Sequence, residues 1–157
     1  MQTPVAPQKF VDATIDTLYM TIIAFTVSAI FALFIGLFLY LCRKDGVYPK
    51  PKLYQVISTI INFLRSTPFV ILMLLLVPVI RLIIGTSIGT NAAVVALIVF
   101  GIPFTARLVE SSFLEIDSGI IEAAKSLGVT TFELIWHFLL PEAASQLLIN
   151  LTIAAVS

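Results

Sequence analysis

The longest uncharged stretch of the chain constrains its fold more than any other feature. Residues 18–41 read LYMTIIAFTVSAIFALFIGLFLYL, and no charge occurs between Asp16 and Arg43. As an α-helix this segment would extend about 36 Å, against about 30 Å for the hydrocarbon core of a bilayer. Lys9 is the one basic residue before it and acidic residues lie beside it, which argues against a cleaved signal peptide. We therefore predict a first membrane span at about 18–42.

Further apolar segments follow, in a sequence that is 59% hydrophobic and 11% charged. A second span is expected at 60–84, bent at its two prolines, with arginines at its ends that extend toward the interfaces. A third span is expected at 90–109, and an incomplete fourth at 141–157, which would reach only about 25 Å. The predicted fold is all-α: a polytopic transmembrane helical bundle forming one domain over 1–157, with three spans and an incomplete fourth.

The distribution of basic residues predicts the orientation, because Lys and Arg accumulate in cytoplasmic loops. With the loop after the first span placed inside, seven basic residues fall on the cytoplasmic side and two outside. The N-terminus is then outside, and the segment 110–140 forms a cytoplasmic loop. The inner residues are Arg43, Lys44, Lys50, Lys52, Arg65, Arg107 and Lys125, and the outer ones are Lys9 and Arg81.

Local signals in this loop predict two short helices. Ser118 can cap the first, which runs to about Leu127. Gly128 then stands where a helix end favours a left-handed backbone, a conformation that glycine adopts without side-chain penalty. The first helix should therefore end in a fixed turn at Gly128.

The second short helix has its own start and stop signals. Thr130 followed three residues later by Glu133 forms a capping box, in which each residue's side chain bonds the other's backbone N–H. Pro141 is expected to break this helix and to start a final apolar helix at Glu142, because proline fits the first turn of a helix but not its interior.

The same loop matches the EAA signature of ABC-importer permeases, EAA-x3-G-x9-I-x-L-P. One position departs from the pattern, since Phe138 stands where isoleucine is preferred. From about residue 16 onward the chain resembles this family, and residues 53–89 resemble the methionine-importer permeases in particular. The matching residues are Glu122, Ala123, Ala124, Gly128, Leu140 and Pro141.

The resemblance implies a permease subunit of an ATP-driven ABC importer in the bacterial cytoplasmic (inner) membrane. In this family the EAA loop forms a coupling helix that docks into a cleft on a cytoplasmic ABC ATPase subunit. Two permease copies, a homodimer, enclose the pathway, and an extracytoplasmic substrate-binding protein delivers the solute. Methionine or a related amino acid is the expected solute. The expected coupling residues are Glu122, Ala123, Ala124, Lys125, Gly128, Leu140 and Pro141.

Physical reasoning supports this role for the loop. Small Ala123 and Ala124 would allow a partner surface to approach closely, and Glu122 and Lys125 could pair with charges around it. The turn at Gly128 would fix the angle between the docking helix and the bundle. The competing interpretation is a short amphipathic helix lying on the membrane lipid.

Permeases of this type continue through a glycine-rich stretch and at least one more span, so we expect this chain to be cut short at its C-terminal end. One alternative function is accordingly a truncated, transport-incompetent membrane fragment that still binds a partner. Another is an ATP-independent channel or carrier, although nothing else accounts for the spacing of the EAA residues.

The sequence offers little for catalysis by this chain. The P-loop pattern G-x4-G-K-[ST] is absent, so ATP is expected on the partner ATPase and no cofactor or enzyme activity on this chain. His137 is the single histidine, and no metal site is expected around it. Cys42 is interpreted as a packing residue and not as a lipidation site. A net charge of zero gives no reason to expect nucleic-acid binding.

Two polar features remain within the predicted helices. Arg107 and Glu110, three residues apart, are expected to pair on one helix face in a structural role. Gln146, Asn150 and Ser157 lie near one face of the last helix. Polar groups at membrane depth usually face the bundle interior or a wet cavity. These three therefore either line the transport pathway or form hydrogen bonds between helices.

Overall fold

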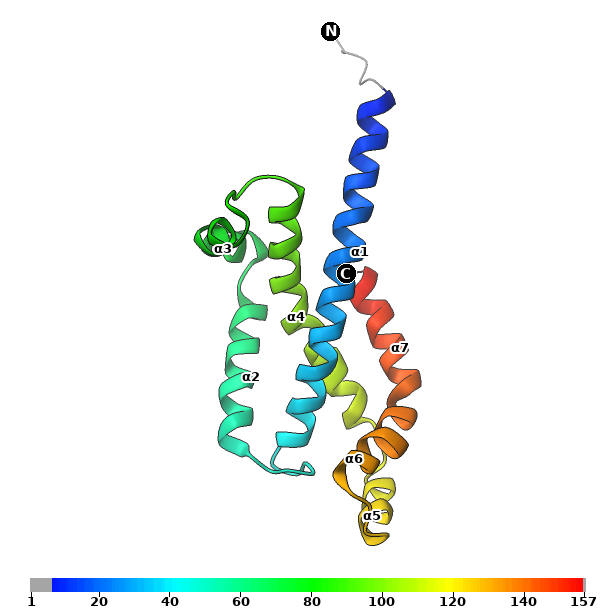
Figure 1. The fold of residues 1–157 in the computed structure, drawn as a ribbon. Coiled ribbons are helices and arrows are strands. Elements are labelled where there is room, and N and C mark those ends of the chain that lie inside the picture. The colour runs from blue at the N-terminus through cyan, green and yellow to red at the C-terminus, as the bar shows by residue number, and fades with distance from the viewer. Residues whose placement is uncertain (1–6, 157) are drawn as a thin grey trace.

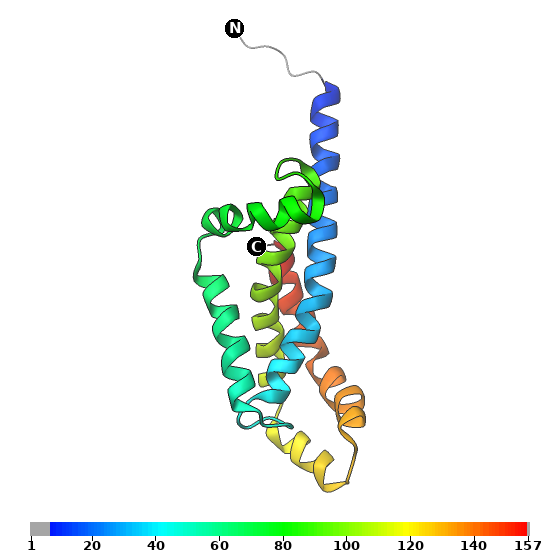
Figure 2. The ribbon, with the colours of Figure 1, turned by 60° about the vertical axis from the view of Figure 1, so that its left-hand side comes forward.

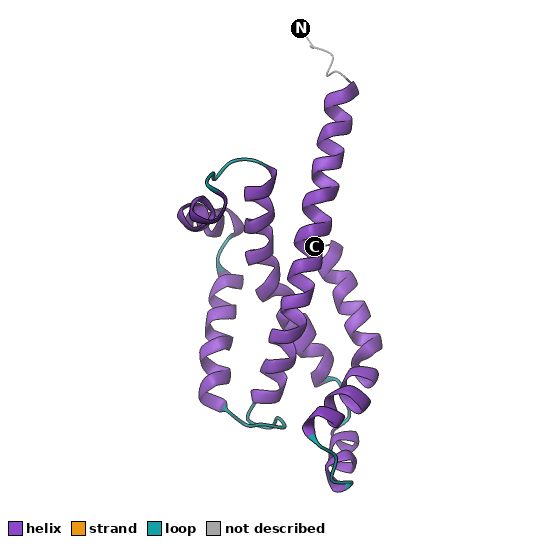
Figure 3. Ribbon diagram, in the orientation of Figure 1, coloured by secondary structure: helices purple, strands orange, loops and turns teal. Residues whose placement is uncertain are grey.

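The computed structural model describes residues 7–156 and shows an all-helical bundle, which confirms the predicted fold class (Figure 3). Helices α1 and α4 run side by side through the middle, with α2 on one side and α7 on the other (Figure 1). No strand occurs within 7–156. The elements are α1 (Pro7–Cys42), α2 (Pro51–Ser66), α3 (Phe69–Ile84), α4 (Thr90–Leu114), α5 (Ser118–Ser126), α6 (Thr131–Glu133), a π-helix η1 (Leu134–Leu139) and α7 (Leu140–Val156).

Helices α1 and α4 pack closely because small residues line their contact. Every fourth residue along one face of α1 is small and buried: Ala24, Ser28, Ala32 and Gly36. A Cβ placed on Gly36 would lie 2.6 Å from Cγ1 of Val109 on α4. Apolar lipid provides no hydrophobic force between helices, so such small residues favour association by letting the two backbones approach. The α1–α4 pair is the centre of the bundle.

The span expected at 60–84, bent at its prolines, is built from two separate helices. Helices α2 and α3 meet at 112° around a short break. Pro68 lacks a backbone N–H and disfavours the helical conformation in the residue before it, and Thr67 is extended at φ −81° and ψ 127°. Pro78 lies inside α3 without ending it.

The break changes the expected place of Arg65. The sequence-based assignment put this residue at the cytoplasmic interface. In the structure Arg65 lies in the last turn of α2, at the end away from the loop that joins α1 to α2 (Figure 2). It therefore does not belong with the basic residues of that loop.

Three helices within residues 7–156 are long and apolar enough to cross a membrane, and the bent α2–α3 pair would be a fourth if it counts as one span. The first of the three is α1, which extends well before residue 18. The second, α4, passes residue 109 and continues to Leu114 without a break at Pro103. The third covers Thr131–Val156.

Pro141 does not end a helix, contrary to expectation. The chain stays helical from Thr131 to Val156, and the turn before Pro141 widens into η1. There the N–H of Leu140 bonds the carbonyl of Ile135, five residues back. Proline in a helix clashes with the carbonyl four residues before it, here that of His137. The wider π turn is a known way to accommodate such a disturbance within a continuous helix.

Candidate functional site

Helix α5 lies at one end of the bundle, at the same end as the α1–α2 loop and opposite the N-terminal end of α1 (Figures 1 and 2). Its N-cap is Asp117, whose carboxylate accepts a hydrogen bond from the N–H of Gly119 at 2.6 Å. The predicted cap, Ser118, is instead the first helical residue. An aspartate one residue earlier satisfies the free N–H groups equally well.

The C-terminal end of α5 confirms the prediction for Gly128. Its φ is +72°, in the left-handed region. The N–H of Leu127 bonds the carbonyl of Ala123, and the N–H of Gly128 bonds that of Lys125. These bonds satisfy carbonyls at the helix end and reverse the chain toward α6.

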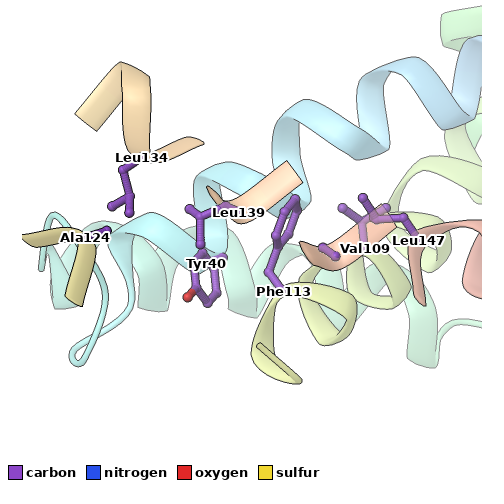
Figure 4. Close-up of a cluster of buried hydrophobic side chains, with 8 residues drawn as sticks. Tyr40, Val109, Phe113, Ala124, Leu134, Leu139 and Leu147 are labelled. Carbon is purple, nitrogen blue, oxygen red and sulfur yellow. The ribbon is translucent and has the colours of Figure 1, made fainter. Parts of the chain in front are cut away.

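The two alanines of the EAA triplet differ in their exposure to solvent. Ala124 is fully buried, in a cluster with Leu134 of η1 and Tyr40 of α1 (Figure 4). Ala123 is exposed. The expectation that both alanines meet a partner is therefore wrong for Ala124, which packs α5 onto its own bundle.

The remaining surface of α5 mixes charge and one large apolar side chain. Glu122 and Lys125 are exposed, as expected. Leu127 is 75% exposed, which is high for a leucine. Leu127 was not among the residues predicted from the sequence, although its place directly before Gly128, at the expected end of the helix, could have drawn attention to it.

The buried cluster that includes Ala124 brings together side chains of α1, α4, α5, η1 and α7 (Figure 4). The rings of Tyr40 on α1 and Phe113 on α4 lie 5.5 Å apart. Leu139 of η1 is fully buried in the same cluster. Buried side chains therefore pack α5 onto a cluster that α1, α4 and α7 share. The full cluster is Tyr40, Val109, Phe113, Ala124, Leu134, Leu139, Ala143 and Leu147.

Two polar contacts fix the second half of the loop. The predicted capping box is confirmed: the N–H of Thr130 donates to Glu133 Oε2 at 2.7 Å, and the N–H of Glu133 donates to Thr130 Oγ1 at 3.3 Å. The hydroxyls of Tyr48 and Thr131 lie 2.7 Å apart, which links the α1–α2 loop to α6. Both contacts therefore fix the start of α6.

The predicted Arg107–Glu110 pair is present, and it is more than a local contact. Arg107 Nη1 lies 2.5 Å from Glu110 Oε2, and Glu110 is 3% exposed. Tyr54 of α2 donates to the same carboxylate at 3.0 Å. Arg107 Nη2 donates to Ser58 and to Asn62, both on α2. The pair therefore attaches α2 to α4.

The polar residues of α7 divide between the two interpretations offered for them. Asn150 is buried, and its amide donates to the carbonyl of Leu108 at 3.1 Å and to Ser112 Oγ at 2.8 Å. Those bonds join α7 to α4. Gln146 donates to Glu115 at 3.1 Å and lines a polar hollow of about 210 Å³ at the base of the bundle. Ser157 lies outside the described residues.

Cysteine and histidine each occur once in the sequence. Cys42 is a free, buried thiol, in agreement with a packing role. No cluster of three or more metal-binding side chains occurs among the described residues, those around His137 included.

Comparison with known proteins identifies the family. The sequence pattern described as "Binding-protein-dependent transport system inner membrane component" matches residues 32–157. The chain belongs to this family. It is an integral, multi-pass membrane protein of the ABC-permease type, in agreement with its apolar helices.

The similar proteins have consistent names. A "Probable D-methionine transport system permease protein MetI" of Vibrio cholerae is 42% identical over 145 residues, 92% of this chain and 64% of that protein. The Escherichia coli K12 D-methionine transport system permease protein MetI is 40% identical over 142 residues, 90% of this chain and 65% of that protein. The chain thus spans somewhat less than two thirds of the length of these relatives.

Solved structures agree with the fold. An inward-facing structure of the MetNI methionine ABC transporter matches with a TM-score of 0.92 at 38% identity, covering 99% of this chain and 72% of that chain. An amino acid ABC transporter crystallised with histidines matches with a TM-score of 0.66 at 25% identity, covering 98% of this chain and 76% of that one.

Proposed function

We propose that this chain is the permease subunit of an ATP-driven importer for methionine or a related amino acid, with α5 as its coupling helix. The observation that carries the proposal is the geometry of α5. One face is buried on the bundle through Ala124, and the other presents Glu122, Ala123 and Leu127 to solvent at the end of the molecule. The names of the similar proteins support methionine as the solute.

In this proposal a cytoplasmic ABC ATPase subunit binds the exposed face of α5. Ala123 allows close approach, Leu127 offers an apolar anchor, and Glu122 and Lys125 pair with charges around the contact. The fixed turn at Gly128 and the cluster under Ala124 pass the movement of the ATPase to the spans. Leu140 and Pro141 contribute through the π turn that keeps η1 and α7 one helix.

Two permease copies would enclose the pathway, and a substrate-binding protein would deliver the solute from outside. ATP binding and solute binding then favour different states of the assembly, which gives alternating access. Gln146 at the polar hollow is the pathway residue that we favour on α7, whereas Asn150 serves mainly to join α7 to α4.

The proposed orientation places α5 in the cytoplasm and the N-terminus outside. Five basic residues lie at the α5 end of the bundle: Arg43, Lys44, Lys50, Lys52 and Lys125. Lys9 and Arg81 belong to the opposite end, near the start of α1 and the end of α3. Arg65 and Arg107 are left out of this count because they lie part-way along the bundle, and the excess of basic charge still favours this orientation.

The test is reconstitution of the permease with a cytoplasmic ABC ATPase subunit from the same organism. Co-purification is expected, and so is ATP-dependent methionine uptake into proteoliposomes when the substrate-binding protein is added. ATPase binding without uptake would indicate the transport-incompetent fragment, and uptake without ATP or ATPase would indicate a channel or carrier. Leu127→Asp is expected to abolish co-purification, while Leu148→Asn, at an exposed position on α7, is expected to leave it unchanged.

A further inference from the structure

Arg65 stands at an unusual depth for a basic residue. It lies fourteen residues after Pro51, about 21 Å along α2 from the α1–α2 loop. Its guanidinium carbon is 6.0 Å from the ring centroid of Phe104, which lies about 15 Å before the end of α4, a helix of roughly 36 Å. Figures 1 and 2 show α2 ending about midway along α4. Arg65 is therefore at about half the height of the bundle, and it is exposed in the single chain.

No acidic side chain compensates this charge within the described residues. The one ion pair within the described residues joins Arg107 to Glu110. Arg65 lies over the ring of Phe104, which offers no oxygen atom as a hydrogen-bond acceptor. The N–H groups of the guanidinium can therefore donate to a ligand. A cation at membrane depth is costly, and such residues usually serve a ligand or ion pathway.

The surroundings of Arg65 form a pocket suited to a small solute that carries a carboxylate and an apolar group. A hollow of about 490 Å³ is lined by Asn62, Arg65, Ser66, Phe100 and Phe104. Its volume lies in the usual range for ligand sites, about 300–1,000 Å³. One wall is polar and cationic, from α2, and the other is aromatic, from α4.

The aromatic wall is shared with a second hollow. Phe100 and Phe104 also line a space of about 190 Å³ between α1, α4 and α7, together with Thr21, Ser28 and Thr105. The two hollows therefore lie on either side of Phe100 and Phe104 of α4. A third hollow of about 600 Å³ between α1, α2 and α4 has only apolar side chains in its lining and offers nothing to a carboxylate.

We propose that Arg65 is the carboxylate-binding residue of an amino-acid subsite in the translocation pathway, with Phe100 and Phe104 holding the apolar side chain of the solute. The planar guanidinium suits a carboxylate because it can donate two parallel hydrogen bonds. A thioether side chain would gain from contact with the two rings, since sulfur packs favourably against aromatic groups. This inference rests on the proposed function, because it assumes an amino-acid solute.

The first measurement is thermal unfolding of the purified permease without binding protein. The two probes are L-methionine and L-methioninol, in which a hydroxymethyl group replaces the carboxylate. L-Methionine is expected to raise the unfolding temperature and L-methioninol is not. The shift should vanish in Arg65→Gln and persist in Arg81→Gln, a matched loss of arginine on α3. Equal shifts with both probes, no shift in the wild type, or a shift retained in Arg65→Gln would each overturn the proposal.

The second measurement is uptake by the assembled transporter. Arg65→Gln is expected to lower methionine uptake about tenfold or more, as for the loss of a charge-assisted hydrogen bond, while the ATPase still co-purifies. Arg81→Gln is the control and should leave uptake and basal hydrolysis unchanged. Arg65→Lys should retain part of the uptake because it keeps the charge but not the paired donors. If Arg65→Gln instead weakens assembly or lowers the unfolding temperature without ligand, Arg65 is a structural residue and the subsite is wrong. Failure of the proposed function is distinct, since it would show as absent ATPase binding in the wild type.

Discussion

At the scale of single residues, the backbone of Gly128 sets the direction in which the chain leaves α5. A Cβ at this position would meet no atom within 4 Å, so a substitution is opposed by the φ of +72° and not by crowding. Gly128→Val is expected to cost about 1–2 kcal/mol or more, because a β-branched side chain disfavours the left-handed region. Membrane insertion should be normal, while ATPase co-purification falls strongly.

Gly128→Asn is the matched control, because asparagine tolerates the left-handed conformation better than other residues with a side chain. It should retain most of the co-purification. Equal binding by wild type and Gly128→Val would show that the angle of this turn does not matter for docking.

The neighbouring alanines allow a sharper comparison at the same scale. Ala124→Trp places a large side chain in a fully buried position, which should lower the stability of the permease itself by about 1–3 kcal/mol or more. Ala123→Trp lies on the exposed face and should leave stability unchanged while blocking the ATPase. Thermal unfolding of the permease alone and co-purification separate the two effects. If both variants behave alike, the division of α5 into an inner and an outer face is incorrect.

Residue-level features that depend on local backbone were predictable. The conformation of Gly128 and the Thr130–Glu133 capping box follow from residues close in sequence, and both are confirmed. The inward direction of Ala124 was not predictable, because the rotation of a nine-residue helix about its axis is decided by what it packs against. That contact comes from Tyr40, which is far away in the sequence, and from Leu134, which belongs to η1.

At the scale of elements, the close approach of α1 and α4 depends on Gly36. Gly36→Val should force these helices apart and destabilise the bundle by about 1–3 kcal/mol, since a Cβ would already lie 2.6 Å from Val109. Phe34→Leu, on a 71% exposed position of the same helix, is the control and should have little effect. Thermal unfolding in detergent measures both. A stable Gly36→Val protein would mean that the helices can separate without loss.

The attachment of α2 to α4 gives a second prediction for an element pair. Glu110→Ala leaves Arg107 partly buried without its carboxylate and removes the acceptor of Tyr54. Loss of one partner of a buried pair typically costs about 3–5 kcal/mol. The double variant Arg107→Met with Glu110→Met should recover part of that loss, because no charge is left uncompensated. Chemical unfolding of the single and double variants measures the difference, and a double variant as unstable as the single one would argue against the pair as the cause.

The existence of the helices was predictable from apolar runs, but two of their boundaries were not. A bend at Pro68 was expected, whereas an angle of 112° between two separate helices depends on how α3 packs against α4. The break expected at Pro141 is absent because η1 widens the preceding turn. The sequence shows where a proline disturbs a helix, but whether the helix then breaks or widens depends on tertiary packing. Here Leu134 and Leu139, at the two ends of η1, are both held in the buried cluster.

At the scale of the whole molecule, the described helices separate the basic α1–α2 loop from the glycine turn between α3 and α4. The basic α1–α2 loop and α5 share one end, and the Gly85–Gly89 turn between α3 and α4 lies at the other (Figure 1). Gly85 and Gly89 both have positive φ, of 83° and 111°. The side on which α5 lies decides whether an ATPase can reach it. Orientation is therefore the property on which the proposed function depends most.

Single cysteines in a Cys42→Ala background test this orientation in intact cells that express the permease without its ATPase. Lys50→Cys and Lys125→Cys lie at exposed positions of the α5 end and should resist a membrane-impermeant thiol reagent. Ile88→Cys, at an 83% exposed position of the opposite turn, should react. All three should react after the membrane is permeabilised, which shows that each thiol is accessible. Labelling of Lys50→Cys and Lys125→Cys from outside, with Ile88→Cys protected, would invert the topology and place α5 where no cytoplasmic ATPase can bind it.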